Sequence, residues 1–173
     1  AAKQWKSKIV KMGTISRDPS GMLVRDLNGD GLEDLLVFFP REPARIVVQA
    51  QDGSLSEAGA NDALRKSQLD SVTADSVGFG DFDGDGREEI LVARSGFVRA
   101  CRLSADNQLS LVGQANAKTT GDRLTAPALA DIDGDGTADL LAYDQANSAL
   151  QVLKRKDGNY SYQSSIAVGK MEP

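Results

Sequence analysis

The chain has 173 residues, of which 40% are hydrophobic, so it is long and apolar enough to form a compact core. It has no histidine and one cysteine, Cys101, which argues against a zinc site, histidine-based acid–base catalysis and an intramolecular disulfide framework. The net charge is −5, but three short loops hold 13 of the 25 acidic side chains and only one base, so the acidity is local. No apolar run reaches about 18 residues, so we expect no membrane insertion. The local acidity indicates metal ligation, and we expect no nucleic acid partner.

The first expected element is a strand over Trp5–Met12, where apolar side chains stand among lysines. It precedes the first complete repeat, and the first strand of a propeller chain often completes the last blade. We therefore interpret residues 1–13 as an orphan outer strand that completes another blade. The alternative is that this segment caps the exposed edge of the first repeat.

Three repeats follow, at a spacing of about 50 residues. We place the first at 14–60, the second with its preceding crossing at 61–117, and the third at 118–173. Each contains four strand-like runs separated by turn signals. These runs are Met22–Val24, Leu35–Phe39, Arg45–Gln49 and Leu55–Ala58; Val77–Phe79, Ile90–Ala93, Phe97–Leu103 and Leu109–Gly113; and Pro127–Leu129, Leu140–Tyr143, Leu150–Arg155 and Tyr160–Val168.

Four consecutive strands per repeat predict an all-β fold of four-stranded antiparallel β-propeller blades. Closed propellers have about four to eight blades, so we expect a part of a larger propeller. Further blades from the same protein, a second chain or a symmetry mate would complete the ring. The crossing Ala60–Asp75 has the spacing of a short helix, with Ala63, Leu64 and Leu69 as its apolar residues.

An acidic nine-residue loop joins the first two strands of each repeat. Oxygen-bearing side chains occupy positions 1, 3, 5 and 9, and glycine occupies positions 4 and 6. Alternate side chains of a tight loop share a focus, position 7 offers its backbone carbonyl, and glycine at position 6 permits the positive φ of a reversing chain. Such an oxygen cage suits a hard cation, and the sequence predicts three Ca²⁺ sites. The predicted ligands are Asp26, Asn28, Asp30, Leu32 and Asp34; Asp81, Asp83, Asp85, Arg87 and Glu89; and Asp131, Asp133, Asp135, Thr137 and Asp139.

Two other kinds of loop share part of this pattern. An EF-hand needs flanking helices and a bidentate glutamate at position 12, where this chain has Val37, Val92 and Ala142. Asp-Gly and Asn-Gly turns also join hairpins without a metal. Three copies with the same ligand positions favour metal binding over such turns.

These loops and their flanking strands resemble the FG-GAP/VCBS repeat family, found in integrin α-subunit heads and many secreted bacterial proteins. Phe79-Gly80 directly before Asp81 matches the FG of the family name, although Arg25 and Ala130 stand before the other two loops. The resemblance implies β-propeller blades, Ca²⁺ at the loop positions, and a secreted, periplasmic or cell-surface location.

The loops differ in ligand charge, which is −3 in the first and −4 in the second and third. More ligand charge tightens Ca²⁺ binding, so the first site is expected to be the weakest. We expect the metal to be structural, because it would join the two inner strands and relieve repulsion among carboxylates.

Several basic and aromatic residues outside the acidic loops could contact a ligand. Arg25, Arg94, Arg99 and Arg102 are more typical of a solvated surface than of an acidic-ligand site. The run Lys154-Arg155-Lys156 reads as an exposed hairpin end. A sugar platform or ordinary packing would both explain the aromatic residues Trp5, Tyr143, Tyr160 and Tyr162.

The sequence thus favours a non-enzymatic, extracellular recognition, adhesion or scaffold module with a protein or glycan ligand. The alternative is part of a secreted propeller enzyme, such as a polysaccharide lyase, whose catalytic residues lie in other blades.

Overall fold

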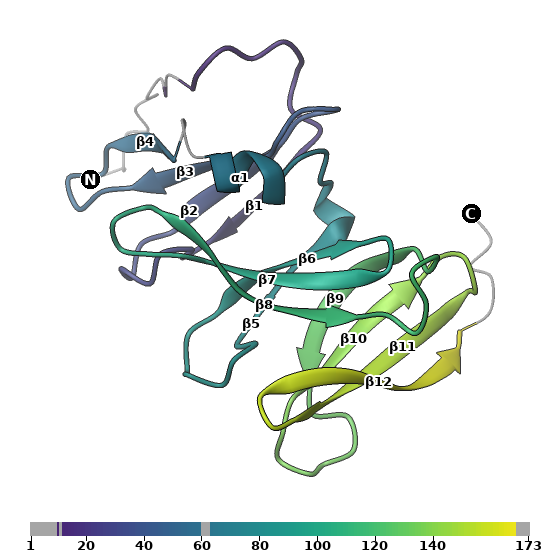
Figure 1. The fold of residues 1–173 in the computed structure, drawn as a ribbon. Coiled ribbons are helices and arrows are strands. Elements are labelled where there is room, and N and C mark those ends of the chain that lie inside the picture. Colours follow the sequence, from purple (N-terminus) through teal and green to yellow (C-terminus); the bar gives the residue numbers. More distant parts are fainter. Residues whose placement is uncertain (1–9, 11, 60–62, 169–173) are drawn as a thin grey trace, which may run out of the picture.

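The computed structural model describes residues 10, 12–59 and 63–168. They form three four-stranded antiparallel sheets, each with its strands in chain order, which lie side by side (Figure 1). The first sheet holds β1 (Gly21–Arg25), β2 (Asp34–Phe38), β3 (Arg45–Gln49) and β4 (Leu55–Ala58); the second β5 (Val77–Gly80), β6 (Glu89–Arg94), β7 (Phe97–Leu103) and β8 (Leu109–Asn116); the third β9 (Leu124–Ala130), β10 (Asp139–Asp144), β11 (Ala149–Lys156) and β12 (Asn159–Ala167).

The predicted fold class of four-stranded antiparallel propeller blades is confirmed. Each of the twelve runs expected in the repeats coincides with a strand, except that Phe39 and Val168 lie one residue beyond β2 and β12. We call the sheets blades 1, 2 and 3 in chain order. The expected strand over Trp5–Met12 falls mostly outside the described residues. The exact limits of the repeats, 14–60, 61–117 and 118–173, stay predictions.

Each acidic loop is the turn of the first hairpin of its blade. The strand before the loop ends one residue before position 1, and position 9 begins the next strand. The ladders pair Arg25 with Asp34, Gly80 with Glu89 and Ala130 with Asp139, so the same register closes all three loops. Strands on both sides exclude the EF-hand.

Blade 2 packs against both neighbours through the two faces of its central strand. Ile90 and Val92 of β6 lie in a core shared with Leu36 and Phe38 of blade 1. The intervening Leu91 lies in a second core, shared with blade 3. Successive side chains of a strand point to opposite faces, so a strand between two cores is a continuous apolar run.

The second core also contains an aromatic contact between blades. The rings of Phe82 and Tyr160 lie with their centroids 4.7 Å apart, so packing rather than a sugar platform explains Tyr160. Cys101 lies in the first core, and burial raises the pKa of its thiol to about 11. A thiol so protonated is a poor nucleophile.

A short helix does lie in the first crossing, as α1 (Ala63–Gln68), followed by the 3₁₀ turn η1 (Ala74–Ser76). Of the three apolar residues of this crossing, Leu69 is fully buried in the first core directly after the helix, whereas the buried side chain within the helix is Arg65 and not Ala63 or Leu64. The Arg65 guanidinium donates to the backbone carbonyls of Ala44 and Gly59, both at 2.8 Å. Among the described residues, no helix is long and apolar enough to cross a bilayer.

The approach of blade 2 to blade 3 depends on a glycine. A Cβ at Gly78 of β5 would collide with the carbonyl oxygen of Pro127 of β9. Because that obstacle is backbone, a side chain cannot move aside to relieve it.

We expect Gly78→Ala to lower the free energy of unfolding by about 2 kcal/mol or more, since the added methyl group pushes two packed blades apart. Urea unfolding measures the loss. Gly21→Ala in β1 is the matched control, because its nearest obstacles are side-chain atoms 3.7 Å away. Equal stability of the two variants would contradict the close approach.

Candidate metal centres

The first aspartate of each loop organises the turn by accepting backbone N–H groups. The Asp26 carboxylate accepts the N–H groups of Gly29 and Gly31 at 2.8 Å and that of Asp30 at 3.2 Å. The other two loops have the same three hydrogen bonds around Asp81 and Asp131. The glycines at positions 4 and 6 have φ between 76° and 88° in all three loops, a range that favours glycine. The positive φ expected at position 6 is therefore present, and position 4 needs it as well.

These bonds stabilise the ionised aspartate. The N–H of Gly136, with those of Gly134 and Asp135, holds the pKa of Asp131 below its ordinary value despite partial desolvation. Donors aimed at a carboxylate favour its charged form. The turn is thus built around an anion.

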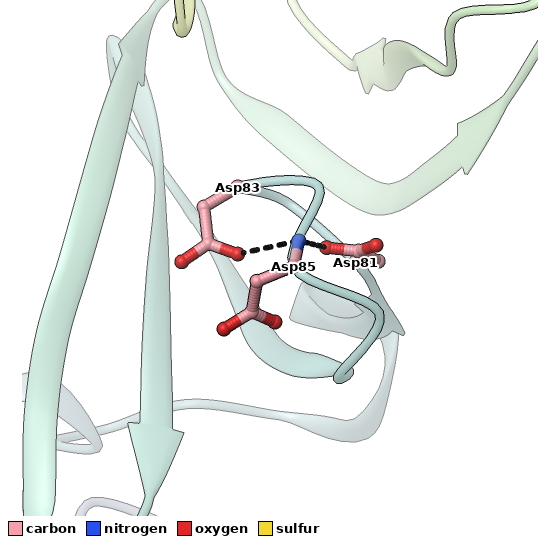
Figure 2. A group of neighbouring side chains, drawn as sticks. All are labelled: Asp81, Asp83 and Asp85. Atoms are coloured by element: carbon pink, nitrogen blue, oxygen red, sulfur yellow. Dashed lines mark hydrogen bonds between the residues drawn. The ribbon is translucent and has the colours of Figure 1, made fainter.

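Positions 3 and 5 each use one side-chain oxygen inside the loop. Figure 2 shows the N–H of Asp85 donating to Asp83 as well as to Asp81, with the Asp83 bond at 3.3 Å. Asp85 Oδ1 in turn accepts the N–H of Arg87 at 3.0 Å. The same bonds recur from Asp30 to Asn28 and from Leu32 to Asp30, and from Asp135 to Asp133 and from Thr137 to Asp135.

Position 9 ties the end of the loop to its start. Asp34 accepts the N–H of Leu27 at 3.0 Å, Glu89 that of Phe82 at 2.8 Å, and Asp139 that of Ile132 at 3.4 Å. All three side chains are buried, and burial raises the pKa of Asp34 even though two backbone N–H groups oppose this.

In blades 2 and 3, the oxygens left over at positions 3, 5 and 9 surround a cationic side chain. Lys154 Nζ lies 2.5 Å from Asp133 Oδ2, 3.4 Å from Asp135 Oδ2 and 3.0 Å from Asp139 Oδ1. The hydrogen bond to Asp133 raises the pKa of Lys154, burial opposes it, and Asp139 adds to the rise.

Blade 2 has the same arrangement with an arginine. Arg102 Nη2 lies 2.9 Å from Asp83 Oδ2, and Nη1 lies 3.1 Å from Asp85 Oδ2. Its guanidinium also pairs with Glu89 Oε1 at the buried end of the loop. The expectation that Arg102 and the run Lys154–Lys156 are solvated surface was therefore wrong for Arg102 and Lys154, since their side chains are only 18% and 25% exposed.

The first loop differs because uncharged donors meet its spare oxygens. Asn28 Nδ2 lies 3.3 Å from Asp30 Oδ2, and the backbone N–H of Gln49 donates to Asp34 Oδ1 at 2.9 Å. Rotation of the Asn28 amide would bring its Oδ1 to the focus and leave Asp30 N–H still bonded to Asp26 Oδ1, which makes an oxygen ligand available at little cost.

The acidic groups in blades 2 and 3 could hold a metal ion. Ligand oxygens of Asp81, Asp83 and Asp85 lie within 4.8 Å of one another, and so do those of Asp131, Asp133 and Asp139. Asp139 Oδ1 is buried and pairs with Lys154, but it accepts no hydrogen bond of ordinary geometry. A buried carboxylate oxygen without such a donor fits a cation ligand.

The second loop contacts both neighbouring blades. Arg25 pairs with Glu88 of the second loop, with Nε to Oε2 at 2.7 Å. Arg155 of blade 3 donates to the backbone carbonyl of Asp83 in the same loop. The second loop is therefore held from both sides, and the sequence pattern gave no sign of either contact.

A separate carboxylate cluster lies at the far end of β10. Gln151 Nε2 donates to Asp122 Oδ2 at 2.7 Å and to Asp144 Oδ2 at 3.1 Å, and all three side chains are buried. Burial acts to raise the pKa of Asp122 and Asp144, but hydrogen bonds from Thr119, Gln151, Asn147 and backbone N–H groups outweigh it and lower both values. This cluster joins the crossing before β9 to blade 3.

Comparisons with known proteins agree with the repeated loops. The FG-GAP-like repeat profile matches residues 26–92 and 81–142. Among solved structures, one similar chain is an Agrocybe aegerita lectin whose title describes specific recognition of non-reducing terminal N-acetylglucosamine. The TM-score is 0.60 at 18% sequence identity, over 96% of this chain and 45% of the lectin chain, so the present chain spans less than half of that protein. The comparison with curated proteins finds no match.

The Asp122–Asp144 cluster predicts a specific sensitivity to acid. An aspartate whose pKa is lower in the folded state stabilises the fold at any pH above its ordinary pKa. This stabilisation is lost as the pH falls through the lowered pKa, and it amounts to about 1.4 kcal/mol for each pH unit by which the pKa is lowered. Urea unfolding in chelator, between about pH 6 and pH 2.5, should show a shallower loss for Asp144→Asn than for the wild type. Asp106→Asn, in an exposed turn, is the control, and an unchanged slope in Asp144→Asn would refute the assignment.

Proposed function

This chain belongs to the FG-GAP-like repeat family, and from that premise we propose that it is a Ca²⁺-stabilised segment of a β-propeller that serves recognition and carries no catalysis of its own. The observation that carries this proposal is the way in which the loops use their side-chain oxygens. One oxygen at each of positions 3, 5 and 9 accepts a backbone N–H of the loop. In blades 2 and 3 the other oxygen of each side chain faces the charged end of Arg102 or Lys154.

The oxygen ligands of these loops suit Ca²⁺ better than a transition metal, because hard cations prefer carboxylate, amide and carbonyl oxygens. The side chains at positions 1, 3, 5 and 9 would hold the ion, with the carbonyls of Leu32, Arg87 and Thr137. The ion would neutralise the loop carboxylates and join the two inner strands of each blade. A structural role of this kind adds stability in proportion to metal occupancy.

We infer that further blades complete the ring. Leu23 of β1 packs on the core shared with blade 2, whereas Met22 and Val24 are 54% and 53% exposed and, by strand alternation, face the other way. Ile166 of β12 is 48% exposed on blade 3. Adjacent blades from the same protein, a second chain or a symmetry mate would cover these apolar side chains.

A cleft between blades 1 and 2 is the proposed recognition surface. It has a volume of about 670 Å³, within the usual range of ligand pockets, and residues of both the first and second loops line it. Arg25, Glu88 and Ser104 offer it hydrogen-bonding groups suited to a sugar. The likeness to a lectin supports a glycan as ligand, and weak oxygen-only Ca²⁺ sites suit the millimolar Ca²⁺ outside cells, so we place the protein in a secreted, periplasmic or cell-surface setting.

Calcium removal should destabilise the protein. At about a hundredfold excess over Kd, each site adds about 2.7 kcal/mol, and 1 kcal/mol shifts the melting temperature of a chain of this size by about 2–4 °C. We therefore expect chelator to lower the melting temperature by about 5 °C or more. Differential scanning calorimetry in Ca²⁺ and in chelator measures the shift, Asp131→Asn should reduce it, and identical traces in both buffers would refute calcium binding.

Glycan binding should depend on the cleft between blades 1 and 2. A glycan array probed in Ca²⁺ should give defined hits that weaken at least about tenfold in Glu88→Ala, because the cleft loses an acceptor and the Arg25 ion pair. Asp106→Asn is the control outside the cleft. Hits that survive Glu88→Ala undiminished would move the site elsewhere, and turnover of a bound glycan would overturn the non-enzymatic assignment.

A further inference from the structure

The position opposite residue 9 of each loop differs among the three blades in a way that bears on the proposed calcium sites. The ladders pair Leu35 with Val47, Ile90 with Cys101 and Leu140 with Leu153, each one step after position 9. In these antiparallel ladders, the residue before each pair on the second strand faces the residue after it on the third strand. Position 9 therefore lies opposite Val48 in blade 1, Arg102 in blade 2 and Lys154 in blade 3. The same backbone site thus carries an apolar side chain once and a cation twice.

The two cations lie where a metal would lie. Lys154 Nζ is 2.5–3.4 Å from the oxygens at positions 3, 5 and 9, which are the same oxygens that the loop backbone leaves over. Ca²⁺ takes oxygen ligands at about 2.3–2.6 Å, so an ion at the ammonium position would draw these oxygens inward by up to about 1 Å. The ammonium and the ion would compete for one place.

Without its cationic neighbour, the buried carboxylate at position 9 would lack a positive partner, which a bound metal ion could replace. Asp139 and Glu89 are buried, and their free oxygens face Lys154 and Arg102. A buried carboxylate without a positive partner is unfavourable, so the cation keeps the metal-free loop folded while it blocks the site. In blade 1, Val48 is buried among apolar side chains, and the backbone N–H of Gln49 meets Asp34 instead.

We propose that Arg102 and Lys154 are tethered cations that occupy the metal positions of blades 2 and 3, stabilise these loops without metal and weaken their calcium binding. This inference rests on the proposed calcium function and identifies residues that tune it. It also revises the charge count, because the −4 of the third loop becomes −3 once Lys154 is included, equal to the first loop. The weakness expected of the first site then no longer follows from charge.

The test replaces Lys154 with methionine, which keeps much of the aliphatic stem and removes the charge. In a Ca²⁺ titration followed by amide NMR, Gly31, Gly86 and Gly136 report the three loops separately, because each N–H donates to the first aspartate of its own loop. We expect the Kd read at Gly136 to fall at least about threefold in Lys154→Met, while Gly31 and Gly86 keep their values. Arg102→Met should do the same at Gly86.

A second readout separates competition from a structural role. In chelator, Lys154→Met should melt below the wild type, and Ca²⁺ should restore more of its stability than it adds to the wild type. A residue that merely supported the fold would lower both metal-free stability and calcium affinity. Lys154→Arg, which keeps the charge, and Lys156→Met, at the exposed end of the same strand, are the controls.

The outcomes distinguish this inference from the function beneath it. Suppose that the wild type binds Ca²⁺ and that the Kd read at Gly136 is unchanged or higher in Lys154→Met. This result would overturn the tethered-cation role alone. No shift at any of the three glycines, in the wild type and in both methionine variants, would overturn calcium binding itself.

Discussion

The carboxylate at position 1 is the group on which each blade depends. Asp26, Asp81 and Asp131 each accept three backbone N–H groups, and these bonds bring the chain back to begin the second strand. The loop is thereby closed by its own donors before any ion enters. Further backbone N–H groups use one oxygen at positions 3 and 5, so that in blades 2 and 3 the remaining oxygens of positions 3, 5 and 9 face one cationic side chain.

The blades are joined through these same loops and through the cores beneath them. The second loop is contacted by Arg25 from blade 1 and Arg155 from blade 3, while β6 sends alternate side chains into two cores. Gly78 permits the close approach of β5 and β9. Order in the second loop is therefore coupled to the packing of both neighbouring blades, so an ion bound there would affect more than its own hairpin.

Repetition of the backbone does not mean repetition of the chemistry. In all three loops the backbone N–H groups bond the same side-chain positions and the strands keep the same register. The residue opposite position 9 nevertheless changes from Val48 to Arg102 to Lys154. Charge at that one place is set by the third strand, which lies outside the loop motif. Equivalent motifs within one chain can thus differ in their affinity for the same ion.

The strands and the hairpin loops could be predicted from the sequence, because short apolar runs and the Asp–Gly pattern are local signals. The same pattern located the acidic side chains of each loop, which remain predicted metal ligands. The contacts of Arg102, Lys154 and Arg65 could be known only once the strands were paired. Arg102 lies 13 residues after Glu89 but Lys154 lies 15 after Asp139, since the intervening turns differ in length, so no fixed spacing relates them. The pairing of the second and third strands places both cations opposite position 9 despite this difference in spacing. Sequence periodicity describes single strands and does not say which residues of two strands pair.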